Sequence, residues 1–172
     1  MSKIIDFEKV IEDNFNLNRI FSSITKPYLL TFFKYCSPYL SEQDYAEYLN
    51  YVYISVEVIL NNVNVSKKEI INFFINANKR YLMSEDDYEV FKAMPDTVKI
   101  YRGVRNEKYK CGISWTLSLE KARWFANRFS KDGIVYECDI PKEYILAYFD
   151  SRNEAEIVVD VTNLRNKIKR YE

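Results

Sequence analysis

The sequence predicts an α+β protein with a helical N-terminal half and a C-terminal half built as a mixed β core. Up to residue 95 the apolar residues recur every three to four positions, which is the period of a helix with one buried face. From residue 97 the period shortens towards two, the alternation of a strand. The 172-residue chain therefore divides into a helical subdomain (1–95) and a β-rich half (96–172), which together are expected to form one compact domain.

Two apolar stripes indicate the first helices. One stripe, near the N-terminus, consists of Ile4, Phe7, Ile11 and Phe15. The other has acids and amides between its members, which are Tyr45, Tyr48, Leu49, Val52, Val56 and Ile59. Both stripes predict amphipathic helices with one face in a core.

Two local caps predict two further helices. Ser66 and Glu69 form a capping box, because the serine hydroxyl accepts from the Glu69 amide while the glutamate reaches back to the Ser66 amide. The inward face of that helix is expected to be Ile70, Phe73, Phe74 and Ala77. Ser84 starts a short helix with acids in its first turn, where the helix dipole favours them, and Pro95 ends it.

The second half is predicted to consist of strands and a single helix. Strands are expected at 98–101, 112–117, 134–140, 145–149 and 154–161. Ser118 caps an amphipathic helix that runs to about Phe129 and turns inward Ala122, Phe125, Ala126 and Phe129. Gly133 marks a turn and Pro141 interrupts the strand pattern. The basic tail, 163–172, is expected at the periphery.

The composition narrows the possible chemistry. Lys plus Arg and Asp plus Glu both number 25, and the resulting net charge of zero argues against a generally basic nucleic-acid binder. The chain has no histidine, which excludes Ser-His-Asp and Cys-His catalysis and disfavours catalytic zinc, so no metal is expected. Cys36, Cys111 and Cys138 lack metal-site spacing and are expected to be free thiols. Without a signal-peptide pattern or a membrane-spanning apolar run, the protein is expected in the cytoplasm.

Three polar segments of the β-rich half carry the functional signal: Tyr101-Arg102-Gly103, Ser114-Trp115-Thr116 and Glu154-Ala155-Glu156. A planar arginine holds phosphate or ribose oxygens with several aligned donors, and a glycine beside it lets the backbone approach a ligand. Residues two apart on a strand share a face, so the serine and threonine form one polar pair and the two glutamates another. Two acids on one face repel, but breaking a glycosidic bond requires a carboxylate beside the developing cation.

The order of these segments resembles the Arg, Ser-Thr-Ser and Glu-x-Glu signature of the arginine-serine-glutamate class of mono-ADP-ribosyltransferases. The resemblance extends from Val98 to Asp160 and includes the intervening SLEKARWFANRF segment. It departs at the middle motif, where Trp115 is expected to face away from Ser114 and to leave the chemistry intact. The resemblance implies a mixed β core of split sheets preceded by a helical subdomain, with NAD as co-substrate and no metal.

The same resemblance assigns the NAD-binding residues. Arg102 would anchor NAD, and the Gly103 backbone would hold the nicotinamide amide. Tyr101 and Thr116 would complete the binding site.

The catalytic residues follow in the same way. Ser114 would support Glu156, Glu156 would bond the ribose 2′-hydroxyl, and Glu154 would orient or deprotonate the acceptor. The Glu-x-Glu form resembles the arginine-modifying members of the class, so the expected partner is a protein that bears an acceptor arginine.

Two alternatives are open at this point: a transferase that modifies nucleic acid, and a non-enzymatic inhibitor that uses the same scaffold to bind a partner protein. Salt-dependent nucleic-acid binding would favour the first, and loss of the Arg, Ser and Glu set would have favoured the second. Frequent Lys, Asn, Ile, Tyr and Phe with only three glycines indicate an AT-rich bacterial or phage source. A compact cytosolic enzyme of this type resembles phage-encoded transferases that act on host or bacterial-defence machinery, and it also resembles intracellular toxins.

Overall fold

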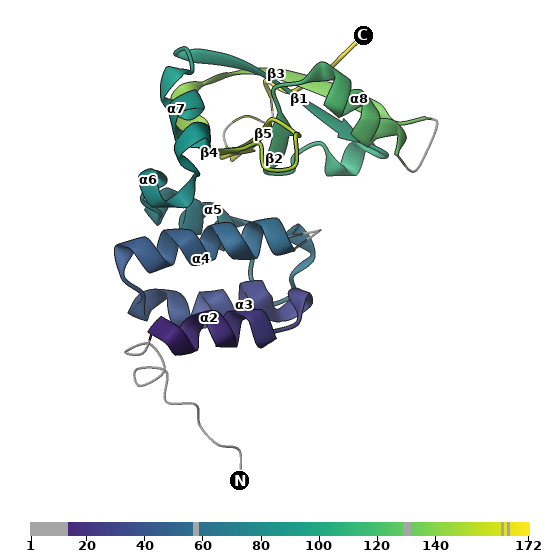
Figure 1. Ribbon diagram of the computed structural model, residues 1–172. Helices are drawn as coiled ribbons and strands as arrows, with labels where there is room; N and C mark the ends of the chain where they lie inside the picture. The colour runs from purple at the N-terminus through teal and green to yellow at the C-terminus, as the bar shows by residue number, and fades with distance from the viewer. Residues whose placement is uncertain (1–13, 57–58, 129–131, 163, 165) are drawn as a thin grey trace. The chain divides into compact units, whose positions relative to one another are not determined.

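The computed structural model describes residues 14–56, 59–128, 132–162, 164 and 166–172 (Figure 1). The predicted stripe through Ile4, Phe7 and Ile11 lies outside these residues, as does Phe129. The chain divides into two compact units, Met1–Leu82 and Met83–Glu172. This division falls after residue 82, whereas the sequence placed it after residue 95.

The described part of the first unit consists of helices joined by short turns and loops. Its helices are α2 (Asn14–Ser23), α3 (Lys26–Cys36), α4 (Glu42–Ser55), α5 (Lys67–Asn76) and α6 (Lys79–Leu82), with short 3-10 turns η1 (Ser37–Tyr39) and η2 (Ile59–Asn61). Helix α4 packs against both α3 and α6 (Figure 1). It ends at Ser55, before the predicted Ile59, because Val56 takes an extended backbone conformation.

Aromatic pairs hold the core of the first unit together. Phe21 stacks on Tyr48 with ring centroids 4.2 Å apart, and Phe33 meets Phe73 edge-on at 5.2 Å. Such offset and edge-to-face pairs add to the stabilisation that comes from burial alone. Between α3 and α4 the side chains of Leu30, Phe33 and Leu49 are completely buried.

The predicted helix caps are confirmed. Ser66 Oγ accepts from Glu69 N, and Glu69 Oε2 accepts from Ser66 N at 2.8 Å, which completes the capping box of α5. Ser84 Oγ accepts from Asp87 N at the start of α7 (Glu85–Ala93). Ser118 Oγ does the same for Lys121 N at the start of α8 (Leu119–Asn127).

Helix α7 belongs to the strand-containing unit, and this explains the shifted division. Its Asp87 carboxylate accepts from Asp150 N at 3.2 Å, and Lys142 Nζ donates to the Lys92 carbonyl at 2.7 Å. These partners lie 63 and 50 residues further along the chain. No local pattern in the helix itself could have reported them.

The strands of the second unit form one antiparallel sheet, with strand order β4-β5-β2-β1-β3-β6. The strands are β1 (Thr97–Val104), β2 (Ser114–Thr116), β3 (Ile134–Pro141), β4 (Ile145–Phe149), β5 (Glu156–Val159) and β6 (Lys169–Arg170), with 3-10 turns η3 (Glu107–Tyr109) and η4 (Lys142–Tyr144). The halves β4-β5-β2 and β1-β3-β6 are joined through one residue pair, Tyr101 and Thr116. The predicted separation into two sheets is therefore replaced by a single sheet with a narrow junction.

Helix α8 lies unusually close to strands β1 and β3. A Cβ atom at Gly103 would collide with the backbone of Ala122, and one at Gly133 would collide with the backbone of Ala126. Both alanines are fully buried on the inner side of the helix. The glycines and alanines together allow this approach, so Gly133 has a packing role in addition to marking a turn.

In the C-terminal part, one sequence expectation needs correction and one short strand was not expected. Strand β5 starts at Glu156, not at Glu154, because Ala155 has a positive φ of 42° that breaks the extended backbone. The basic tail adds a short strand that the sequence did not predict: Lys169 and Arg170, both exposed, form the edge strand β6 and pair with Glu137 and Tyr136 of β3.

Candidate active site

The site begins with a buried glutamate that a serine orients. In the antiparallel pair of β2 and β5, Thr116 lies opposite Glu156 and Ser114 lies opposite Val158, so the three polar side chains share one face. Ser114 Oγ donates to Glu156 Oε1 at 2.6 Å. The Glu156 side chain is only 8% exposed. A short bond to an ionised acceptor of this kind fixes the rotamer of the carboxylate.

An arginine that the sequence analysis did not single out completes the pair of glutamates. Arg152 Nη2 lies 2.9 Å from Glu156 Oε2 and 3.1 Å from Glu154 Oε2. Its single nitrogen thus joins both carboxylates and offsets the repulsion between them. The sequence signal was available in the segment Arg-Asn-Glu-Ala-Glu, but an arginine ahead of two acids is common in exposed loops.

The two glutamates come together for a reason other than the predicted one. Alternation along a strand cannot place them, because Glu154 precedes β5 and Ala155 has left-handed backbone geometry. Glu154 is held instead by the loop that leads into the strand. It is more exposed than Glu156, at 24% of its side chain, so the outer carboxylate faces solvent while the inner one is enclosed.

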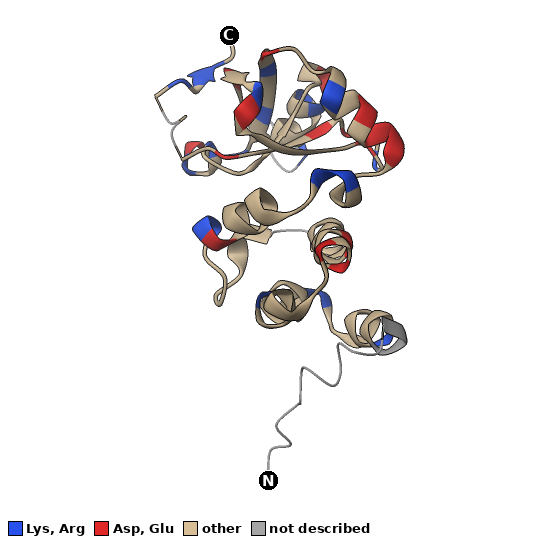
Figure 2. Cartoon of the chain, turned by 90° about the vertical axis from the view of Figure 1, so that its left-hand side faces the viewer, with Lys and Arg blue, Asp and Glu red and all other residues tan. Residues whose placement is uncertain are grey.

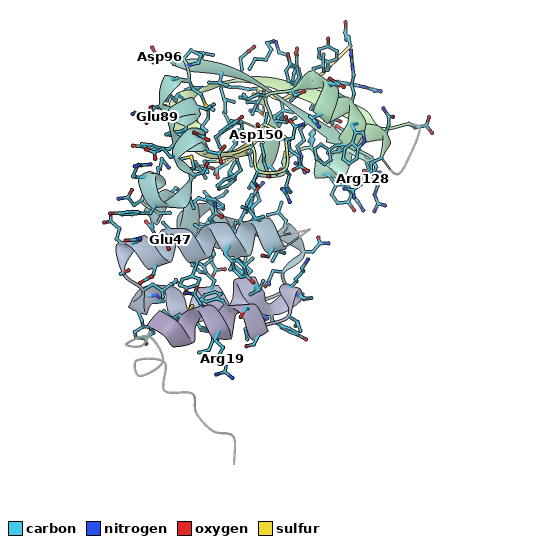
Figure 3. The ribbon with its side chains drawn as sticks, in the orientation of Figure 1. Arg19, Glu47, Glu89, Asp96, Arg128 and Asp150 are labelled. Carbon is cyan, nitrogen blue, oxygen red and sulfur yellow. The ribbon has the colours of Figure 1, made fainter. Side chains whose placement is uncertain are left out.

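Asp150 organises that loop. Its side-chain Oδ1 accepts from Ala155 N at 2.8 Å, and its carbonyl accepts from Asn153 N at 2.7 Å. Both Asn153 and Ala155 have positive φ, at 53° and 42°, a conformation that costs a non-glycine residue free energy. The contacts from Asp150, which is labelled in Figure 3, maintain it.

Thr116 ties strand β2 to the same loop. Its hydroxyl donates to the Glu154 carbonyl at 2.7 Å and accepts from Ser118 N at 3.0 Å. The residue is 4% exposed. In this structure the Thr116 hydroxyl positions the backbone of Glu154, which is a structural role. The ligand-binding role expected from the sequence stays a prediction.

The Arg102 side chain extends from strand β1 to the backbone of the segments that follow it. Its Nε donates to the Tyr109 carbonyl at 3.0 Å, and its Nη1 donates to the Ser114 carbonyl in a short contact. Gly112 leaves space for the guanidinium, because a Cβ there would overlap it. Arg102 is thereby connected to Glu156 through one residue, Ser114.

The loop that receives Arg102 carries further positive charge. Arg105 and Lys108 both lie over the Tyr109 ring, at 5.7 and 4.9 Å from its centroid. These two cations, Arg105 first, lower the pKa of the Tyr109 hydroxyl from its usual value. The sequence analysis did not identify Arg105 and Lys108, because the segment that contains them has the composition of an ordinary polar turn.

The remaining predicted residues have structural surroundings of their own. Gly103 lies against α8, and packing alone accounts for a glycine there. Tyr101 is half-buried and meets the Tyr171 ring edge-on, with centroids 6.0 Å apart. Trp115 is buried, and its indole N–H donates to the Gly112 carbonyl at 2.9 Å, so it points away from the polar face as expected.

A separate cavity of about 300 Å³ lies in the first unit. Its lining residues are Asn18, Phe21, Ser22, Glu47, Tyr48 and Tyr51, none of which belongs to the site described above. Among the described residues, no group of three or more Asp, Glu, Cys or His side chains is placed to hold a metal ion. Within the same part of the chain, no helix is both long and apolar enough to cross a bilayer.

Comparisons with models of known protein families, with curated proteins and with solved structures gave no match to this chain. The functional argument therefore depends on the residues of the site and on their geometry.

Proposed function

We propose that the protein is an NAD-dependent mono-ADP-ribosyltransferase whose acceptor is an arginine of a target protein. The observation that carries the proposal is the enclosed Glu156 carboxylate, oriented by Ser114 and accompanied by the more exposed Glu154. Cleavage of the nicotinamide–ribose bond develops positive charge on the sugar, and a fixed carboxylate in a poorly solvated position stabilises such charge.

The proposed reaction uses the two glutamates in different ways. The bond between ribose C1′ and the nicotinamide nitrogen breaks, and nicotinamide leaves as a neutral molecule with the bonding electron pair. A guanidinium nitrogen of the acceptor forms the new bond to C1′ and gives up one proton. Glu154, the more accessible carboxylate, is suited to orient that nitrogen and take the proton, while Glu156 faces the sugar.

The charges around Arg102 support NAD as the substrate. The pyrophosphate of NAD is a dianion, and Arg102, Arg105 and Lys108 form a cationic group at the end of β1 and in the loop that follows. A guanidinium that already holds two carbonyl oxygens in a fixed plane is well oriented for phosphate oxygens. Over the rest of the second unit, acidic and basic segments are interspersed, as Figure 2 shows. This charge pattern does not favour binding of a long polyanion such as a nucleic acid.

The decisive experiment measures nicotinamide release from NAD with agmatine, a small guanidinium compound, as the acceptor. We expect turnover by the unchanged protein and a loss of about 10²-fold or more in Glu156→Gln, because the carboxylate acts on charge present only in the transition state. Glu143→Gln removes an exposed carboxylate from η4 and serves as the matched control. Near-normal turnover in Glu156→Gln would refute the proposal.

A further inference from the structure

Arg152 has a relation to the glutamates that the proposed reaction does not use. One guanidinium nitrogen contacts both carboxylates, at 2.9 and 3.1 Å, and the arginine side chain is 44% exposed. The group thus approaches the two acids from the solvent side. An acceptor arginine would have to approach them from that side as well, because the inner side of Glu156 is enclosed by Ser114 and the sheet.

We propose that Arg152 is a built-in substitute for the acceptor guanidinium: it occupies the acceptor position in the free protein and leaves when an acceptor arginine enters. This inference rests on the proposed function, since it assigns a role at the same site. It makes Arg152 a residue that determines how tightly the acceptor binds.

The loop does not need the Arg152 side chain to keep its shape. Asp150 holds the amides of Asn153 and Ala155, and Thr116 holds the Glu154 carbonyl. These contacts all involve the backbone of the loop. The Arg152 side chain can therefore swing out while Glu154 remains in position.

Orientation of the inner carboxylate is also independent of Arg152. Ser114 bonds to Oε1 of Glu156, whereas Arg152 contacts Oε2. Removing the arginine leaves the serine contact in place and takes away the guanidinium that bridges the two carboxylates. Two carboxylates side by side favour binding of a replacement cation, and a guanidinium matches them better than an ammonium does because of its planar set of donors.

The test is a titration of agmatine against the protein without NAD, followed by NMR or calorimetry. The Arg152 side chain is the exposed member of the ion pair, so removing it as a competitor in Arg152→Ala should lower the dissociation constant of agmatine about 5-fold. Arg152→Gln, which keeps a similar length, should show the same gain. Arg152→Lys should give a smaller gain, since the ammonium still competes.

Two controls make the result specific. Arg170→Ala removes an exposed guanidinium from β6, at the opposite edge of the sheet, and should leave agmatine affinity unchanged. Adding Glu154→Gln to Arg152→Gln should abolish the gain, because one of the two carboxylates is lost. Equal or weaker agmatine binding in both Arg152→Ala and Arg152→Gln would overturn the inference and show that Arg152 only supports the carboxylates.

Activity measurements on the same variants separate this inference from the proposed function. If the transferase proposal holds, the KM for agmatine should fall in Arg152→Ala in parallel with its dissociation constant, while the KM for NAD stays close to that of the unchanged protein. Absence of nicotinamide release from every variant would refute the transferase proposal. The agmatine dissociation constants would still decide whether Arg152 occupies a guanidinium site.

Discussion

At the scale of single residues, Arg102 illustrates how one side chain serves two purposes. Its Nε and Nη1 bond to the carbonyls of Tyr109 and Ser114 in this structure, and the proposed function adds phosphate oxygens of NAD. A lysine has a single nitrogen and cannot reach two carbonyls and a phosphate together.

Arg102→Lys should therefore bind NAD at least about 10-fold more weakly, although the charge is unchanged. Isothermal titration with NAD measures this directly. Arg19→Lys, which makes the same exchange at an exposed position of α2 in the first unit, should bind NAD normally. Identical NAD dissociation constants in Arg102→Lys and the unchanged protein would remove Arg102 from the NAD site.

The two glutamates should be separable by their reactions. In Glu154→Gln we expect transfer to agmatine to fall by about 10²-fold while slow hydrolysis of NAD to free ADP-ribose persists, because water requires less orientation than a guanidinium. Nicotinamide release and agmatine labelling are measured in parallel on one sample. An equal loss of both would mean that the glutamates act as one unit, and no loss of either would mean that the acceptor is not arginine.

At the scale of secondary-structure elements, the N-terminus of α5 combines three interactions on one carboxylate. Glu69 closes the capping box with Ser66 and accepts from Lys34 Nζ of helix α3 at 2.8 Å. The bond from Lys34, followed by those from Ser66, lowers the pKa of Glu69 to about 2. The unfolded chain has a glutamate pKa of about 4.3.

The lowered pKa predicts the sign of a pH effect. Glu69 contributes stability fully above pH of about 4.3, and this contribution is lost as the pH falls towards 2, because the unfolded chain takes up the proton first. The stability difference between the unchanged protein and Glu69→Gln should thus be largest at neutral pH and vanish near pH 2. Urea unfolding at several pH values measures it, with the exposed Glu89→Gln as a control. A difference independent of pH would contradict the assignment.

The sequence predicted elements well where local residues determine them. Ser66, Ser84 and Ser118 begin helices because each cap involves an amide three residues away, and those starts agree with the structure. It failed where distant residues decide. The start of β5 depends on the backbone of Ala155, which Asp150 holds, and the membership of α7 depends on contacts with Asp150 and Lys142.

The candidate site shows the same division. The family resemblance implied that Ser114 supports Glu156, and the two side chains are in contact. The register of β2 against β5 places them on one face. Glu154 was placed by an incorrect argument, and Arg152 was missed. Both belong to a loop whose conformation includes two residues with positive φ, which side-chain periodicity does not encode.

At the scale of the whole molecule, the three cysteines report on burial in both units. Burial raises the pKa of the Cys36 thiol to about 12 and that of Cys138 above its usual value, whereas Cys111 is partly exposed. Since the thiolate is the reactive form, one thiol should react rapidly with a maleimide at pH 8 and two should react only after unfolding. Mass spectrometry identifies the labelled residue, expected to be Cys111. Rapid labelling of Cys36 or Cys138 in the folded protein would contradict the described cores.

Because the junction of the sheet is narrow, Arg102 contributes to holding its two halves together. One residue pair joins β1 to β2, and the guanidinium reaches from β1 to the carbonyl of Ser114 at the start of β2, as a cross-brace between the two halves. A ligand that takes the Arg102 donors from that carbonyl would leave one residue pair to join the halves. We therefore expect NAD binding to change the rate of hydrogen exchange at the amides on either side of the junction.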